Sequence, residues 1–295
     1  RFAGRGRPLL VMDSRDLLDF NTTTLKARLR NAWERFTYWL ARTLADGQTA
    51  ITPRLAHLVG IPPEQLWGVW PSGVAPETFA VSRAERRWPV AGEPVRLTYA
   101  GIFLEQRNLL PLARAVRRAN DEGLAFTLSL YGDGPLRPAL EAAAAESGGC
   151  VRVEQPIPYE QVPVMLSEAH IGVTSLPAPS DVKYEASSPL KMFEYMAAGL
   201  PMIATRNNCH LDVVGDGGYV FWADDPGEEQ LLAALRRAWA ARDRLAELGQ
   251  AAYHDVHEWT WAAAARKLHG ALAEGLRRRR TTPVAAPLAA GKPNR

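Results

Sequence analysis

The sequence predicts an α/β protein with one complete doubly wound parallel sheet and part of a second domain. Three observations lead to this fold class. The chain has 295 residues, which is room for about two domains. Its 47% hydrophobic and 23% charged residues are the balance of a chain that forms a core. From residue 95 onward, apolar β-rich runs alternate with segments of helical periodicity, as in a parallel sheet covered by helices on both faces.

The first part of the chain has a less regular pattern. The run PLLVMD from Pro8 predicts a buried strand. Thr24 to Leu44 has apolar residues at helical spacing and Lys and Arg on the opposite face. It therefore predicts a basic amphipathic helix, which either packs on a sheet or contacts a membrane surface. A short strand is expected at Thr49 to Thr52, a turn at Trp70 to Val74, and a polar linker from Ser82 to Pro94.

In the second part of the chain, from Val95 onward, expected strands alternate regularly with expected helices. Ligands of such sheets bind at the carboxyl ends of the strands. The tail from Arg277 is rich in Arg, Ala and Pro and has no apolar period, so we expect it to be disordered. The expected strands are Val95 to Gly101, Phe126 to Gly132, Val151 to Glu154, Ile171 to Ser175, Pro201 to Thr205 and Tyr219 to Ala223. The expected helices are Leu109 to Glu122, Leu136 to Glu146, Tyr159 to Glu168, Leu190 to Ala198, Glu228 to Leu248 and Thr260 to Leu276.

The charge distribution argues against a nucleic-acid partner. The net charge is +3, but nine basic residues and no acid lie in residues 1–7 and 277–295, which leaves 26 basic against 32 acidic residues in between. A nucleic-acid reader needs a basic face on its folded part. Two cysteines cannot build a disulfide framework, and no apolar run is long enough for a membrane span. We therefore expect a cytoplasmic protein, whose basic segments could touch the inner face of the membrane.

The most specific segment is SSPLKMFEYMAAGLPMIAT, from Ser187 to Thr205. Ser187 or Ser188 can cap a helix whose first turn contains Pro189. The start of a helix binds anions through its free N–H groups, and Lys191 adds a charge suited to phosphate. Glu194 lies on nearly the same face, where it can accept hydrogen bonds from ribose hydroxyls. Alternatively, Lys191 and Glu194 form a surface ion pair of small energy.

This segment resembles the nucleotide-binding signature of family 4 glycosyltransferases, which are retaining two-domain enzymes of the GT-B fold. The resemblance covers roughly residues 8–275. It also includes YAGIFLEQRNLLPLARA (Tyr99 to Ala115), LYGDGPLRPALEA (Leu130 to Ala142), PIPYEQVPVMLSEAHIGV (Pro156 to Val173), WPSGVAPETF (Trp70 to Phe79) and HEWTWAAAARKL (His257 to Leu268).

The resemblance implies four parts of the chain. Residues 1–88 would be the C-terminal portion of the acceptor-side N-terminal domain, with its linker. Residues 89–257 would be the Rossmann-like donor-binding domain, residues 258–276 the helix that crosses back, and residues 277–295 a disordered basic tail. A complete first domain needs more strands before Pro8, and the chain opens with Arg1, so we expect an N-terminally truncated protein.

The resemblance also implies the roles of the site residues. Arg107 and Lys191 would neutralise the leaving diphosphate, with the N–H of Leu190 beside them. Glu194 would bind the ribose. The nucleotide sugar would further lie against the glycine turns at Gly101 and Gly132, the helix start at Ser188 and Pro189, and Pro158 at the nucleobase. The implied donor is a nucleoside-diphosphate sugar and the acceptor a glycan or a lipid-linked glycan, with no metal and no further cofactor.

The sequence departs from the family pattern at two positions. Ile102 stands where the family often has an arginine, so one of two cations is absent. The family's first glutamate would fall on Ala186, with Glu185 beside it. The expected function is retaining sugar transfer in glycan, glycolipid or polysaccharide synthesis. A nucleotide-sugar epimerase of the same architecture and a non-catalytic nucleotide-sugar-binding remnant remain alternatives. An NAD-dependent oxidoreductase is disfavoured, because no G-x-G-x-x-G follows Tyr99.

Overall fold

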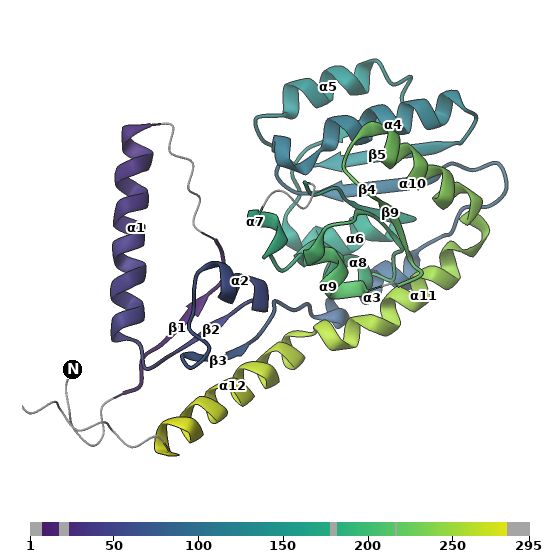
Figure 1. Ribbon diagram of the computed structural model, residues 1–295. Coiled ribbons are helices and arrows are strands. Elements are labelled where there is room, and N and C mark those ends of the chain that lie inside the picture. The colour runs from purple at the N-terminus through teal and green to yellow at the C-terminus, as the bar shows by residue number, and fades with distance from the viewer. Residues whose placement is uncertain (1–7, 18–23, 178–181, 216, 282–295) are drawn as a thin grey trace, which may run out of the picture.

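The computed structural model describes residues 8–17, 24–177, 182–215 and 217–281 (Figure 1). Two parallel sheets organise this part of the chain. A three-stranded sheet has the order β1-β2-β3, and a six-stranded sheet has the order β6-β5-β4-β7-β8-β9. The larger sheet is doubly wound, because the strand order reverses between β4 and β7. The predicted α/β fold class is confirmed.

The three-stranded sheet comes from the first part of the chain. Its strands are β1 (Val11–Ser14), β2 (Gly47–Ala50) and β3 (Leu66–Val69), with α1 (Leu25–Leu44) and α2 (Pro53–Leu58) between them. Thr24 caps α1 by accepting a hydrogen bond from the N–H of Ala27, which explains where the helix begins. Figure 1 shows α1 standing beside this sheet, apart from the helices of the larger one. Strand β3 is an element that the sequence patterns do not single out.

The six-stranded sheet contains the six expected strands. They are β4 (Val95–Ala100), β5 (Phe126–Tyr131), β6 (Val151–Glu154), β7 (Ile171–Thr174), β8 (Met202–Thr205) and β9 (Val220–Ala223). Its helices are α4 (Leu109–Asp121), α5 (Arg137–Ala145), α6 (Val162–Ser167), α7 (Val182–Glu185), α8 (Leu190–Ala197), α9 (Asn208–Val214), α10 (Glu228–Ala240) and α11 (Leu245–Asp255). Short 3-10 helices are η1 (Pro76–Phe79), η2 (Glu105–Arg107), η3 (Tyr159–Gln161), η4 (Arg242–Arg244) and η5 (Val256–Trp259).

The hydrophobic core lies on both faces of the larger sheet. Helices α4, α5 and α10 pack on one face, and α6, α8 and α11 on the other. The single helix expected from Glu228 to Leu248 is wrong, because η4 interrupts it. Residues Arg242–Arg244 form a 3-10 turn, which lets Leu245 pack into the core with no exposed surface.

The expected polar linker is instead partly helical and firmly packed. Residues Ala80–Glu85 form α3, in which Ser82 is fully buried. The Arg86 guanidinium donates hydrogen bonds to four backbone oxygens at the ends of α6 and α8, those of Leu166, Ala169, Ala198 and Gly199. Carbonyls at helix ends lack intrahelical donors, and an arginine fork satisfies several of them at once. A charged segment can therefore belong to the interior.

Helix α12 (Trp261–Thr281) connects the two sheets, and Figure 1 shows it running from the larger unit beneath the smaller one. The Trp67 ring on β3 lies where a Cβ on Gly275 of α12 would be, only 1.9 Å from Cδ2 of that ring. The prediction that the helix ends at Leu276 and that disorder begins at Arg277 is wrong, because the helix continues to Thr281. Arg277 and Arg278 both pair with Glu274, which favours continuation of the helix. Residues 282–295 of the expected tail lie outside the described residues, as do residues 1–7.

Among the described residues, no helix combines the length and the apolar character needed to cross a membrane.

Candidate active site

A hollow of about 340 Å³ lies at the carboxyl ends of β4, β5 and β6. It is next to the point where the strand order reverses, which is where doubly wound sheets bind ligands. Its walls come from the loops after these three strands and from α8. The lining residues are Ala100, Gly101, Ile102, Tyr131, Gly132, Asp133, Pro156, Ile157, Tyr159, Val162, Lys191 and Glu194.

Two glycine turns shape the floor of this cleft. Gly101 and Gly132 have φ values of +150° and +153°, which L-residues rarely adopt. A Cβ on Gly132 would lie 1.9 Å from the carbonyl oxygen of Gly101, so the two turns are in direct contact. A Cβ on Gly101 would lie 2.7 Å from Nζ of Lys191. The structure therefore brings Gly101, Gly132 and Lys191 together, as the resemblance implies.

Helix α8 begins without a side-chain cap. Its N-cap residue is Pro189, and the expected capping by Ser187 or Ser188 is wrong. Ser187 donates its hydroxyl hydrogen to the Tyr184 carbonyl oxygen, and Ser188 Oγ accepts from the N–H of Ser72, which follows β3. The Ser187 hydroxyl is thus used within its own turn, and that of Ser188 in a contact between distant parts of the chain. The first N–H groups of α8 are thus left for solvent or an anion.

Lys191 lies at this helix start and is largely enclosed. Burial lowers the pKa of its ammonium; the Glu194 charge opposes the shift, and the Arg107 charge adds to it. No carboxylate among the described residues lies within 4.0 Å of Lys191, so the expected alternative of a Lys191–Glu194 surface ion pair is wrong. Its Nζ instead stands 5.1 Å from the ring centroid of Tyr99 on β4.

Glu194 lies one turn further along α8 and also lines the cleft. Burial raises the pKa of its carboxyl group, and the charge of Lys191 partly opposes this. Its carboxylate has no hydrogen-bond or ion-pair partner among the described residues. In that part of the chain, the side-chain polar atoms that are both buried and without a partner belong to Gln48 and Arg107. The carboxylate oxygens of Glu194 are therefore accessible. The carboxylate is available to accept hydrogen bonds from a ligand.

The other expected site residues lie around the cleft rather than in its wall. Arg107 ends η2; its guanidinium carbon stands 5.2 Å from the ring centroid of Tyr184, and its Nε is buried without a partner. Leu190 is 49% exposed at the start of α8. Pro158 is exposed, while its neighbours Ile157 and Tyr159 line the cleft.

Tyrosines are the side chains that sequence reasoning missed. Tyr131 and Tyr159 line the cleft, and Tyr99 lies beneath Lys191. Tyr159 and Glu194 line the same cleft, and burial and the charge of Glu194 raise the pKa of Tyr159. Tyr99 and Tyr131 stand at the ends of strands β4 and β5, next to the two glycine turns. A sequence signal was therefore present, since these strand ends meet at the ligand-binding edge.

A family match covers the part of the chain that forms the cleft. The profile of the family described as "Glycosyl transferases group 1" matches residues 94–241, half of the 295 residues. The chain belongs to this family. A curated relative is the amylovoran biosynthesis glycosyltransferase AmsK of Erwinia amylovora, 25% identical over 179 residues. The alignment covers 60% of this chain and 42% of that protein, so the chain spans less than half of the length of this relative.

Solved structures share the fold of this group 1 family member at low identity. A glycosyltransferase from Rickettsia africae has a TM-score of 0.68 and 13% identity, covering 90% of this chain and 70% of that one. Anabaena HepE in complex with UDP has a TM-score of 0.70 and 15% identity, covering 90% and 72%. Sucrose-phosphate synthase from Thermosynechococcus elongatus has 0.66 and 22%, covering 92% and 67%. These likenesses show the GT-B fold.

The two departures from the family pattern have structural consequences in this glycosyltransferase family member. Ile102 is 50% exposed at the mouth of the cleft. Glu185 is 5% exposed and turned to the junction of the two sheets, where its Oε1 accepts from the N–H of Asn208 and its Oε2 pairs with Arg54 at 3.4 Å. Glu185 is therefore already engaged in a structural contact.

The two buried histidines, His170 and His210, have structural partners. His170 Nδ1 accepts from the N–H of Arg96, and its Nε2 donates to the carbonyl oxygen of Arg87. His210 is fully buried between Thr205 and Thr174. Among the described residues, no group of three or more His, Cys, Asp and Glu side chains could hold a metal ion.

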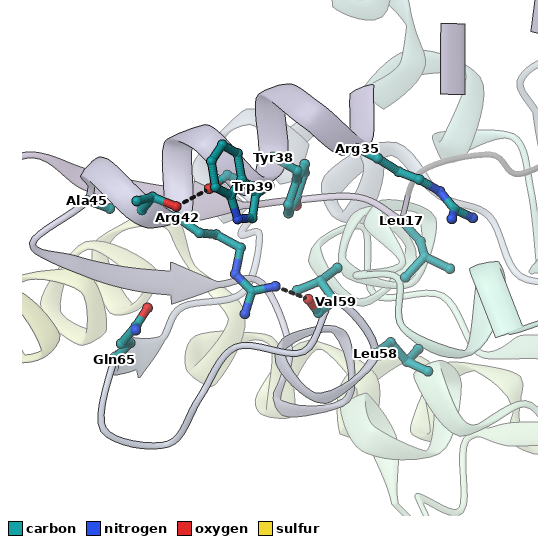
Figure 2. A pocket seen from close by; sticks show the side chains of 10 residues that line it. Leu17, Arg35, Tyr38, Trp39, Arg42, Ala45, Leu58, Val59 and Gln65 are labelled. Atoms are coloured by element: carbon teal, nitrogen blue, oxygen red, sulfur yellow. Dashed lines mark hydrogen bonds between the residues drawn. The ribbon is translucent and has the colours of Figure 1, made fainter. Parts of the chain in front are cut away.

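A larger hollow of about 690 Å³ lies between α1 and α2 (Figure 2). Tyr38, Trp39 and Arg42 of α1 face Leu58 and Val59 across it. Arg42 spans the gap and donates to the carbonyl oxygens of Val59 and Gly60. The Arg42 side chain thus holds α1 on the small sheet. Among the described residues, only the smaller cleft brings a cation together with the two glycine turns.

Proposed function

We propose that this chain binds a nucleoside-diphosphate sugar and serves the transfer of its sugar to an acceptor hydroxyl with retention of configuration, as in family 4 glycosyltransferases. One observation supports this more than any other. The uncapped start of α8 and the cation of Lys191, which has no carboxylate partner among the described residues, meet at a cleft that also holds the accessible carboxylate of Glu194. This combination suits a diphosphate joined to a ribose.

Each residue has a distinct task in the proposed reaction. The bond between the anomeric carbon and the diphosphate breaks, and its electron pair goes to the phosphate oxygen. Lys191, Arg107 and the N–H of Leu190 stabilise that developing charge, so the scheme requires no metal. The acceptor oxygen attacks the same face of the sugar, forms the new bond to the anomeric carbon and passes its proton to the departing diphosphate oxygen. Glu194 holds the ribose, and the loop at Pro158, through Ile157 and Tyr159, contacts the nucleobase.

A panel of donors tests the proposal. We expect UDP-, GDP- or ADP-linked sugars to raise the melting temperature of the chain, because ligand binding to the native state stabilises it by mass action. At 100 times Kd this amounts to about 2.7 kcal/mol, which is a shift of several degrees. Absence of a shift with every donor at millimolar concentration, in protein with a cooperative unfolding transition, would overturn the proposal.

Products distinguish transfer from the alternatives. A nucleotide-sugar epimerase would convert the donor without an acceptor, and a non-catalytic remnant would bind the donor without converting it. Where transfer to an acceptor is followed, Lys191→Ala should lower turnover by about 10², the effect of losing one positioned donor at a developing charge. Unchanged turnover would remove Lys191 from the mechanism.

We also propose that the acceptor is a growing glycan or a lipid-linked glycan at the inner face of a membrane. Two observations support this. AmsK is named as a glycosyltransferase of amylovoran biosynthesis. Helix α1 exposes Trp33, Phe36 and Trp39 at 66%, 49% and 60%, beside several Lys and Arg side chains. Aromatic residues and cations together favour an anionic lipid surface.

Sedimentation with vesicles tests this contact. Anionic vesicles should bind the chain at low salt and release it at high salt, and Trp33→Ser with Trp39→Ser should weaken binding. Trp261→Ser is the matched control, because Trp261 is 48% exposed on a different helix. Vesicle binding that changes neither with salt nor with the α1 substitutions would contradict the membrane contact.

A further inference from the structure

Each of the two cations near the cleft lies over a tyrosine ring. Nζ of Lys191 is 5.1 Å from the ring centroid of Tyr99, and the guanidinium carbon of Arg107 is 5.2 Å from that of Tyr184. Cations within about 6 Å of a ring face are attracted by its quadrupole. Within the described residues, neither cation has a carboxylate within 4.0 Å, so the rings are the groups that orient them.

A ring and a carboxylate orient a cation with different consequences. A carboxylate cancels the positive charge and competes with an incoming anion. A ring attracts the cation without cancelling its charge, and the attraction grows when water is excluded. Lys191 is half-buried and thus partly withdrawn from water. A ring partner therefore suits a lysine whose task is to present a full charge to an anionic ligand.

Tyr99 is the more firmly held of the two rings. It is 1% exposed near the end of β4, and its hydroxyl donates to the carbonyl oxygen of Ile102 at 3.1 Å. The same side chain thus fixes the turn that contains Gly101 and supports the ammonium that lies against this turn. A shift of the Tyr99 ring would displace both parts of the cleft together.

We propose that Tyr99 is a positioning residue, which holds the Lys191 ammonium toward the diphosphate of the donor without neutralising it. This inference rests on the proposed function, because it assumes that the ligand carries a diphosphate. In this role the Tyr99 ring orients the ammonium, as a carboxylate does in an ion pair. The ring, rather than the hydroxyl, carries the effect on Lys191.

Calorimetry of a nucleoside, its monophosphate and its diphosphate tests the role of the ring, using the base that the donor panel selects. Tyr99→Leu should weaken diphosphate binding about tenfold, the scale of a desolvated cation–π contact, and leave nucleoside binding nearly unchanged. Tyr99→Phe keeps the ring and should restore the preference for the diphosphate. A purely structural role would weaken all three ligands alike.

Tyr219→Leu is the matched control. Tyr219 is as buried as Tyr99 and also donates from its hydroxyl, to Asp255 at 3.0 Å, but it lies beside β9, outside the cleft lining. This variant should lower the melting temperature without changing the preference for diphosphate. Equal preference in Tyr99→Leu and the wild type, or a Tyr99→Phe variant as impaired as Tyr99→Leu, would overturn the proposal.

A ligand-free measurement separates this proposal from the proposed function. The ring stabilises the charged form of Lys191, so Tyr99→Leu should lower the pKa of Lys191 below its wild-type value, followed by the chemical shift of its Cε. Tyr99→Phe should not lower it. If the pKa falls as expected but no nucleotide binds to the wild type, the contact stands and the proposed function fails. If nucleotide binds and the pKa does not move, the positioning role fails.

Discussion

The two sheets of this protein differ in the size of the hydrophobic core that packs against them. The six-stranded unit has apolar clusters on both faces, and its largest fully buried side chains include Tyr99, Phe103, Phe126 and Phe193. The three-stranded unit has a cluster of Ala50, Ala56 and Ile61 and a second one that it shares with Ala186 of the larger unit. Its helix α1 buries Asn31 and exposes its large apolar side chains.

This difference teaches that the two units hold together by different means. Burial of apolar area is the main favourable term of folding, so the larger unit can stabilise itself. The smaller unit depends on contacts with the rest of the chain, namely Trp67 against Gly275, the hydrogen bond from Thr52 Oγ1 to Ala186, and Arg54 against Glu185. The candidate site lies in the self-sufficient unit.

Core truncation should show the largest effect and test this difference directly. Leu128→Ala removes a fully buried side chain from a central strand of the larger sheet and should cost about 4 kcal/mol of unfolding free energy. Ile61→Ala, at a 7% exposed position in a small cluster, should cost about 2 kcal/mol or less. Urea unfolding measures both, and equal losses would contradict the comparison.

Substitutions of Glu194 and Glu185 should give the next largest difference, in nucleotide affinity. Glu194→Ala should weaken nucleotide binding by about 2–3 kcal/mol, the scale of hydrogen bonds to a charged group. Glu185→Gln is the control, because its carboxylate belongs to the contact with Arg54 and Asn208 at the junction of the two sheets. Calorimetry should find that Glu185→Gln changes affinity little. A larger loss from Glu185→Gln would move the ribose site toward the junction.

Acid should weaken the larger unit through its buried histidines. Burial lowers the pKa of His170 to about 4, and the charge of Arg96 adds to this. Between pH 6.5 and 4 the unfolded chain then binds more protons than the folded one, so stability falls as the pH falls. We expect a loss of about 1–2 kcal/mol from His170 on going from pH 7 to 5, seen in the melting temperature. His170→Gln should flatten this pH dependence, and an unchanged slope would exclude His170 as its source.

The contact of α12 with the small sheet should show the smallest effect, in opposite directions at two glycines of one helix. A Cβ on Gly275 would clash with Trp67, so Gly275→Ala should cost about 1–2 kcal/mol. A Cβ on Gly270 would meet nothing within 4 Å, so Gly270→Ala should stabilise the helix by up to about 1 kcal/mol. Thermal unfolding checks the signs, and stabilisation by both would show that α12 does not support the small sheet.

Regular alternation made the larger sheet predictable from sequence. Its six strands are found where apolar, β-rich runs such as Met202–Thr205 occur, because parallel strands covered on both faces favour apolar sequence. Strand β3 and the break between α10 and α11 could not be read in the same way. Leu66–Val69 is short and half-buried, and η4 follows from how Leu245 packs. Local pattern carries no information on such contacts.

Some residues of the candidate site could likewise be predicted from the sequence, and others could not. Lys191 and Glu194 follow from one contiguous motif, whose spacing places them at one helix start. The glycine turns at Gly101 and Gly132 follow from two other segments of the resemblance, each at the end of a strand. The role of Ser188 did not follow, because its partner, the N–H of Ser72, is 116 residues away in the sequence. The rings of Tyr99 and Tyr159 were likewise not assigned to the site from sequence, although Tyr99 lies near a strand end at the ligand-binding edge.

The amino-acid sequence by itself determined the α/β class, the strands of the larger sheet and the segment that carries Lys191 and Glu194. These depend on periodicity and spacing, which act between residues close along the chain. Only the tertiary structure decided that Lys191 rests on an aromatic ring, that Glu185 faces the junction, and that the charged segment at Arg86 is enclosed by helix ends. These depend on which distant groups share a volume from which water is excluded, because there each polar group must find a partner within the fold.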